Sequence, residues 1–326
     1  MKKSRTAHIL LLAVLVGQFA FSKILGLLEL RYSVTGALIL SQLTILVPFG
    51  IYCVVTRKNP LEIIRFKKIN MISVFMAFLV AIFSYPIVIF LNMVSMLFVE
   101  NAVVDIMPSV LELGIGPALL LMAVTPAVVE ETIFRGTLYN TYSKSNPVAG
   151  LFLSAVLFGL MHMNFNQLPY AIYIGIIAVL MLEACDSILA PMIIHLTMNG
   201  SSTVLAFITT ALQGEEALTQ TTNFREALIE SFKLSAKEMA LPFTEAQIDE
   251  MGALVILISL AAFAVFAIIA LAFVLIFVYI AFCVNKRKPK EVFKKPESIE
   301  KRGMVDIWLV IFTIYTLYEC FSSMRG

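Results

Sequence analysis

Six side chains that could carry acid–base chemistry lie inside strongly apolar stretches of the sequence. They are Glu130, Glu131, Arg135, His162, His195 and Asn199. Ionisable groups in such stretches are unfavourable to bury in lipid, so they are functional candidates and are expected to face the interior of a helical bundle. Carboxylate, imidazole and amide groups that converge in a medium of low dielectric constant would suit hydrolysis by an activated water molecule.

Helical spacing divides these groups, because residues four apart lie on one face of a helix and adjacent residues diverge by about 100°. Glu131 and Arg135 are therefore predicted to stack as an ion pair, whose simplest role is to stabilise their own helix. Glu130 points elsewhere and lacks that neutralising partner. His195 and Asn199 share a face, so both can donate hydrogen bonds in one direction.

The chemistry that this set favours is metal-free hydrolysis. We expect Glu130 to act as general base on a water molecule that His162 holds, with the proton shared between them. His195 and Asn199 would donate to the developing oxyanion. No serine or cysteine occupies a recognisable nucleophile arrangement, so direct attack by water is the simpler scheme. The alternative is zinc bound by Glu130, His162 and His195, but the chain has no HExxH motif and asparagine is a poor zinc ligand.

The depth of each group in its helix permits these residues to converge. Glu130 and His162 lie on either side of a turn expected near residues 143–146, and both are ~20–25 Å from it at the rise of an α-helix. His195 and Asn199 lie ~12–18 Å beyond the short turn near Asp186. Helix tilt could close the difference.

The elements that must position these groups are long apolar helices. The chain is 60% hydrophobic and 14% charged, far from the roughly half apolar and quarter charged composition of soluble domains. Runs of about 18 apolar residues or more, enough to cross ~30 Å of hydrocarbon, recur along it. The prediction is an all-α polytopic bundle of about eight spans, with a ninth apolar stretch at 305–321 that either crosses or lies along the membrane surface. The spans are expected near 8–28, 34–55, 71–98, 114–139, 148–165, 168–185, 187–208 and 252–284.

Basic residues gather in three segments that eight spans would place on one side of the membrane: the N-terminus, 57–68 and 286–302. Because Lys and Arg favour the cytoplasmic side of short loops, we expect a cytoplasmic N-terminus. This pattern suits a bacterial plasma membrane, and a copy in the endoplasmic reticulum would show it too; the short loops and the lack of an organelle signal favour the bacterial membrane. The expected partners are the lipid bilayer and a peptide or membrane-protein substrate. A net charge of +2 offers no argument for nucleic acid.

Three motifs in order resemble those of the CAAX prenyl protease and bacteriocin-processing family, also called Abi. They are Glu130-Glu131-x-x-x-Arg135, Phe158-x-x-x-His162 and His195-x-x-x-Asn199, within residues 117–202. The resemblance implies an intramembrane endopeptidase in which Glu130 and His162 activate water. It also implies that His195 and Asn199 form the oxyanion hole, with Glu131 and Arg135 in support.

Four regions follow from this interpretation. Residues 1–113 are N-terminal transmembrane helices, 114–208 the catalytic core, 209–250 an acidic extracytoplasmic insert, and 251–326 a transmembrane helix, basic tail and terminal apolar segment. Glu183 and Asp186 are expected at the membrane boundary, and His8 is expected to take no part in the site. Two other functions remain open: a non-catalytic scaffold or bacteriocin self-immunity protein, and a transporter that relays protons.

Overall fold

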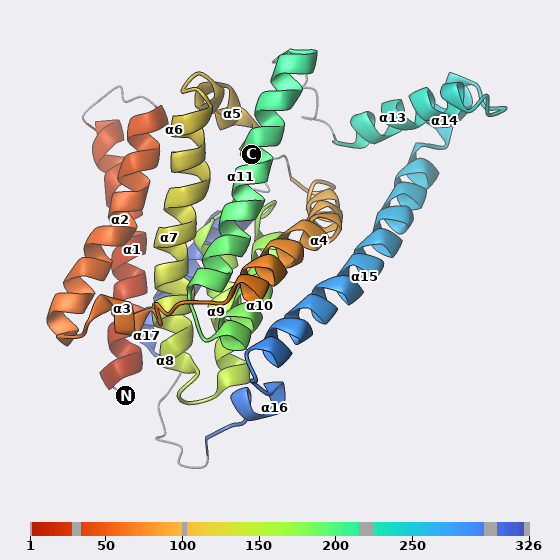
Figure 1. The fold of residues 1–326 in the computed structure, drawn as a ribbon. Coiled ribbons are helices and arrows are strands. Elements are labelled where there is room, and N and C mark those ends of the chain that lie inside the picture. Colours follow the sequence, from red (N-terminus) through yellow and green to blue (C-terminus); the bar gives the residue numbers. More distant parts are fainter. Residues whose placement is uncertain (1, 28–33, 100–102, 215–223, 297–304, 323–326) are drawn as a thin grey trace.

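The computed structural model describes residues 2–27, 34–99, 103–214, 224–296 and 305–322 of the chain, and these fold into helices (Figure 1). The described residues contain no β-strand, so the predicted all-α class is confirmed. Parts of the predicted insert and of the basic tail, residues 215–223 and 297–304, lie outside the described residues. The order of elements follows the order of the predicted apolar segments.

Each predicted apolar segment corresponds to a helix. Eight of the nine segments form one helix each: α1 (Lys2–Leu27), α2 (Val34–Thr56), α4 (Met71–Ser95), α9 (Pro147–Met161), α10 (Leu168–Cys185), α11 (Leu189–Gln213), α15 (Gly252–Val284) and α17 (Ile307–Ser322). Within the described ranges, six helices are long and apolar enough to cross a membrane, and three shorter apolar helices accompany them. The number of spans therefore stays a prediction.

The remaining predicted segment, 114–139, is one continuous helical rod of changing pitch. It is built from five consecutive elements: α6 (Ile115–Leu119), η1 (Leu120–Val124), α7 (Thr125–Glu131), η2 (Thr132–Tyr139) and α8 (Asn140–Tyr142). The two η elements are π-helices, whose wider turns occur mostly as short bulges and often at functional sites. Glu130, Glu131 and Arg135 all lie on this rod.

The basic segments lie toward one end of the bundle and the acidic insert toward the other. The start of the chain, α3 (Pro60–Ile63) and α16 (Pro289–Val292) are at the lower end in Figure 1. At the opposite end, α13 (Phe224–Glu238) and α14 (Glu245–Glu250) pack on the start of α15 through a small apolar cluster. The short helix α5 (Val103–Leu111) also lies toward that end.

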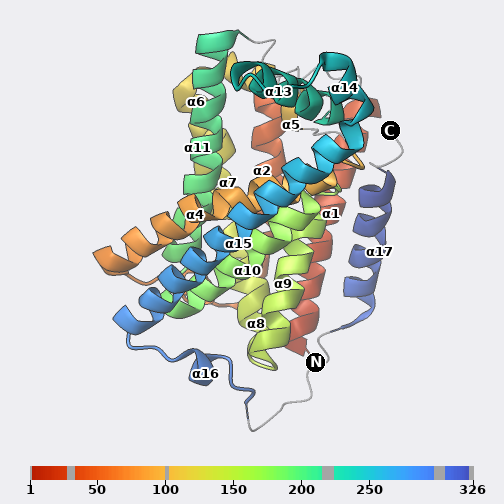
Figure 2. The same ribbon diagram turned by 90° about the vertical axis from the view of Figure 1, so that its right-hand side faces the viewer.

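Helix α17 lies alongside α1 rather than across its end, as Figure 2 shows. A buried polar contact joins the two helices, because His8 is fully buried and its Nδ1 is 2.9 Å from Oδ1 of Asp306, just before α17. Helix α17 therefore runs along the bundle, which favours the crossing arrangement over the surface one. His8 has a structural contact here that the sequence did not indicate.

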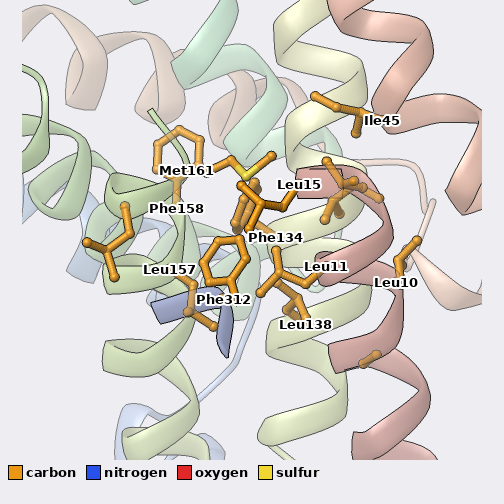
Figure 3. Close-up of a cluster of buried hydrophobic side chains, with 14 of the residues drawn as sticks. Leu10, Leu11, Leu15, Ile45, Phe134, Leu138, Leu157, Phe158, Met161 and Phe312 are labelled. Carbon is orange, nitrogen blue, oxygen red and sulfur yellow. The ribbon is translucent and has the colours of Figure 1, made fainter. Parts of the chain in front are cut away.

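An apolar core surrounds the rod on the side of α1, α9 and α17. Figure 3 shows its side chains, among them Leu11, Phe134, Phe158 and Phe312, packed between these helices. Phe134 and Phe158 lie with ring centroids 5.1 Å apart in an edge-to-face arrangement. Because interiors of this kind are close-packed, the core fixes the rod against α9 and so determines where Arg135 lies.

Candidate active site

The first pair of candidate residues forms as the spacing predicts. Arg135 Nη1 donates a hydrogen bond of 2.9 Å to Oε1 of Glu131, one turn earlier on the rod. The Glu131 side chain is 0% and that of Arg135 1% exposed. The Arg135 guanidinium also lies 4.2 Å from the centroid of the Phe158 ring, a cation–π contact from α9. The ion pair thus joins two helices through one aromatic ring.

His195 of α11 completes a buried cluster with this pair. Its Nδ1 is 2.9 Å from the same Glu131 Oε1 that accepts from Arg135. An ionised carboxylate only accepts hydrogen bonds, so this contact places the proton of His195 on Nδ1. The other ring nitrogen, Nε2, faces Glu130 with 3.9 Å to Oε2. The cluster therefore runs from Arg135 through Glu131 and His195 to Glu130.

Sequence reasoning missed the contact between Glu131 and His195. It paired Glu131 with Arg135 and had His195 donate to the oxyanion together with Asn199. In the structure Nδ1 of His195 contacts Glu131 and Nε2 faces Glu130, so the donation to an oxyanion stays a prediction, for Nε2. Helical spacing cannot reveal a contact between residues 64 apart in sequence, and the estimated depths had separated these groups.

Asn199 is also engaged more closely than the sequence indicated. Its Nδ2 donates a 3.0 Å hydrogen bond to the carbonyl oxygen of Met122 in η1. Pro126 lies four residues after Met122 and has no N–H to offer that carbonyl, so the side chain of Asn199 serves as donor in its place. One amide hydrogen of Asn199 is thereby used, and the second remains for another acceptor.

His162 ends α9 and is held by its own helix. Its Nδ1 is 2.9 Å from the carbonyl oxygen of Phe158, one turn earlier, and the two rings lie edge to face at 5.0 Å. With Nδ1 donating, Nε2 of a neutral ring is an acceptor. Phe158 also lies edge to face with His195 at 6.1 Å, so it is the common neighbour of both histidines. The contacts described for His162 include no hydrogen bond to Glu130.

Two atoms of the buried ion pair have no hydrogen-bond partner in the part of the chain that is described. They are Oε2 of Glu131 and Nη2 of Arg135. Most buried polar groups in proteins are hydrogen-bonded, and an unpaired charged atom is unfavourable. Other buried polar atoms of the described chain share this state, among them Nε of Arg287 and Nε1 of Trp308, so the roles of Glu131 and Arg135 stay a prediction.

The residues of the zinc alternative do not assemble into a ligand set. Among the described residues, no group of three or more His, Cys, Asp and Glu side chains is placed to hold a metal ion. Glu130 and His195 approach each other, and both histidines have Nδ1 engaged by an oxygen, which leaves Nε2 for another partner, as in zinc-ligating histidines. The choice between the metal-free scheme and zinc bound by Glu130, His162 and His195 therefore stays a prediction.

Glu183 and Asp186 lie outside this cluster, at the basic end of α10. Arg65 and Arg287 pair with both carboxylates, and Lys67 pairs with Asp186. Sequence reasoning placed these two acids at the boundary but missed their cationic partners. The concentration of basic residues in 57–68 was the available signal, although it could not specify which of them pairs.

The fold and the cluster together define a class: a helical protein with several helices long and apolar enough to cross a membrane and a buried cluster of ionisable side chains. Residues 113–201 match the family model described as type II CAAX prenyl endopeptidase Rce1-like. The resemblance to the CAAX prenyl protease and bacteriocin-processing family is thereby confirmed, over the region that carries all three motifs. No curated protein and no solved structure matches the chain. The match and the apolar helices support a CAAX-type protease in general terms and an integral membrane protein.

Proposed function

We propose that the protein is an intramembrane endopeptidase that hydrolyses a peptide bond of a membrane-associated or peptide substrate. The observation that carries this proposal is the chain of contacts from Arg135 through Glu131 and His195 to Glu130. In this chain of contacts Glu130, which has no salt bridge with a lysine or arginine among the described residues, lies beside an oriented imidazole. Its side chain is 19% exposed, whereas that of Glu131 is 0% exposed, so Glu130 is the carboxylate that a water molecule can reach.

In the proposed reaction, Glu130 removes a proton from water as the oxygen attacks the scissile carbonyl carbon. The carbon–oxygen double bond opens, and its electron pair forms the oxyanion of a tetrahedral intermediate. Collapse of that intermediate re-forms the carbonyl and breaks the bond to nitrogen. Glu130 returns its proton to the leaving amine, so the products are a carboxylic acid and an amine.

His162 is proposed to orient the attacking water. Its Nδ1 is fixed by the Phe158 carbonyl, so Nε2 can accept a hydrogen bond from water and share its proton. The ring is half-buried, and its edge-to-face contact with Phe158 limits rotation. Such positioning reduces the entropy that must be lost on reaching the transition state.

His195 and Asn199 are proposed to stabilise the oxyanion. The free amide hydrogen of Asn199 can donate directly, while the first holds the side chain to Met122. His195 donates from Nε2 as a doubly protonated ring, which takes its second proton from solvent before the substrate binds and keeps it through the reaction, and Glu131 stabilises that positive ring through its Nδ1 contact. Fixed donors in a water-poor site are more effective than the same groups in water.

We further propose that the reaction needs no metal or other cofactor. Residues 114–208 would form the catalytic core, and residues 209–250 an extracytoplasmic insert. The N-terminus faces the cytoplasm of a bacterial plasma membrane. These assignments rest on the positions of the motifs and of the basic segments.

The test compares wild type with Glu130→Gln on fluorogenic and lipidated peptides in detergent, with and without a chelator. Glu112→Gln makes the same chemical change at an exposed glutamate and serves as the control. We expect Glu130→Gln to lose about 10²- to 10⁴-fold in kcat, as for loss of a general base, with no effect of chelator. Chelator-sensitive cleavage would contradict the metal-free scheme. Absence of cleavage by a folded wild type would favour the non-catalytic scaffold or self-immunity role.

A further inference from the structure

Arg65, in the connection between α3 and α4, uses its whole guanidinium group in contacts with other elements. Its Nε is 3.0 Å from Oδ1 of Asp186, and Nη1 is 3.2 Å from Oδ1 of Asn140. Nη1 and Nη2 also donate to the two oxygens of Glu183, and Nη2 donates to Asp186. Three acceptors on two different parts of the bundle therefore surround one planar group, whose donor geometry is fixed.

The backbone beside Arg65 packs directly on the rod that carries Glu131. The Asn140 side chain donates from Nδ2 to the carbonyl oxygens of Ile63 at 3.0 Å and Gly136 at 2.9 Å. At Gly136, a Cβ atom would lie 2.7 Å from Cγ2 and 3.1 Å from Cα of Ile64. Only glycine allows this close approach, one residue after Arg135 of the site.

The same segment is tied to the turn that begins α11, the helix of His195. The Ile188 N–H donates a 3.2 Å hydrogen bond to the carbonyl oxygen of Arg65, and Ser187 Oγ donates to that of Lys67. The turn itself is tight, because Asp186 has a left-handed backbone with φ of 53°. His195 follows the start of α11 at Leu189 by about two helical turns.

Electrostatic attraction between Arg65 and the carboxylates of Glu183 and Asp186 stabilises these contacts. Burial acts to lower the pKa of the Arg65 guanidinium, but hydrogen bonds and attraction from Glu183 and Asp186 outweigh it and raise the pKa. The Arg65 side chain is 19% and that of Glu183 7% exposed. Removing one member of such a buried pair leaves an uncompensated charge, which is strongly unfavourable.

We propose that Arg65 is a positioning residue that sets the depth of the rod relative to α11, and so the contact between Glu131 and His195. The two helices meet at the site through that 2.9 Å contact and at the basic end through Arg65. The kinetic part of this proposal rests on the proposed peptidase function, whereas the geometric part stands without it.

The geometric part is tested with spin labels on the two helices. Val128 of the rod and Leu205 of α11 are 47% and 61% exposed, so both accept a label after replacement by cysteine. The four native cysteines, Cys53, Cys185, Cys283 and Cys320, are replaced by alanine in all samples. In Arg65→Gln, we expect the distance distribution between the labels to shift or broaden by about 1–2 Å, the scale of helix shifts in proteins.

Arg57→Gln is the matched control. Arg57 lies in the neighbouring connection, between α2 and α3, has a similar left-handed backbone with φ of 53°, and is exposed. It has no ion pair within the described part of the chain. The control removes the same charge from the same surface, so its label distances and peptide cleavage should equal those of wild type.

Measurements of kcat and KM distinguish a role of Arg65 in positioning the site from a role in stability alone. We expect Arg65→Gln to lower kcat by about 10- to 100-fold, as misplacement of about 1 Å can, with KM within about threefold. Asn140→Ala removes the side-chain contacts of the rod with Arg65 and Ile63, together with the bond to the Gly136 carbonyl, and keeps the ion pairs of Arg65, so it should shift the label distance in the same direction. That variant decides the question if Arg65→Gln fails to fold.

Unchanged label distances in both variants would overturn the proposal, whether or not cleavage falls. A shifted distance with wild-type kcat would overturn the role in positioning the site. A wild type that cleaves no peptide would count against the proposed function. The label distances would still test whether Arg65 sets the depth of the rod relative to α11.

Discussion

Two clusters of paired acids and bases, one around Arg65 and one around Glu131, differ in how far they are enclosed by the protein. At the basic end, all three nitrogens of the Arg65 guanidinium donate to acceptors, and of its two carboxylate partners Glu183 is buried and Asp186 is partly open to solvent. At the site, Glu131 and Arg135 are enclosed among apolar side chains, yet each keeps one polar atom without a partner among the described residues. The two clusters therefore differ in how far they are enclosed and not in whether every polar atom is paired, because Nε of Arg287 at the basic end also has no partner among the described residues. Removing one member of the more enclosed pair leaves the more poorly compensated charge.

The largest expected effect on stability is at Glu131. In Glu131→Ala, Arg135 would remain buried without its carboxylate, which destabilises by about 3–5 kcal/mol. Glu183→Ala should destabilise less, by about 1–3 kcal/mol, because Arg65 keeps Asp186 and Asn140 as acceptors. Unfolding in detergent with increasing denaturant measures both values. A larger loss in the free energy of unfolding for Glu183→Ala than for Glu131→Ala would contradict this difference between the two clusters.

A second expected effect concerns the close approach of Ile64 to the rod. Gly136→Ala places a methyl group 2.7 Å from Ile64 Cγ2, so the segment must move and the free energy of unfolding should fall by about 1–3 kcal/mol. Gly116→Ala, on the same rod, meets no atom within 4 Å and is the control. Equal stability of the two variants would show that residues 63–65 can move away from the rod at no cost in stability, and so do not hold it in position.

The smallest expected effect is a pH dependence at the basic end. Burial acts to raise the pKa of Asp186, but hydrogen bonds from Lys67 and Arg65 outweigh it and lower the pKa. A carboxyl with a lowered folded pKa stabilises the protein above its unfolded pKa of about 3.9 and loses that contribution as pH falls further. Melting temperatures between pH 5 and 3, expressed against Asp186→Asn, should show the extra loss only in wild type. Parallel curves would contradict this assignment.

The sequence predicted the features that depend on one helix at a time. Apolar length located the nine helical segments, and four-residue spacing predicted the Glu131–Arg135 pair. Both predictions are confirmed, because membrane thickness and helical pitch determine them with little help from the rest of the fold.

Most contacts between helices could not be predicted from the sequence. The Glu131–His195 contact, the pairing of Arg65 with Glu183 and the His8–Asp306 contact each join residues far apart in sequence. Their formation depends on helix tilt and depth, which periodicity does not determine. The π-helical turns of the rod were also missed, although Pro126 beside the motif marked a backbone irregularity.

Glu130 and His195 are proposed to act on one reacting centre. The most direct test measures kcat/KM for Glu130→Gln, His195→Ala and the double variant on one cleavable peptide, relative to wild type. Groups that act as a unit are strongly non-additive, so each single change should cost at least about 100-fold and the double little more than the worse single. Losses that multiply, or a Glu130→Gln variant as active as wild type, would contradict the claim.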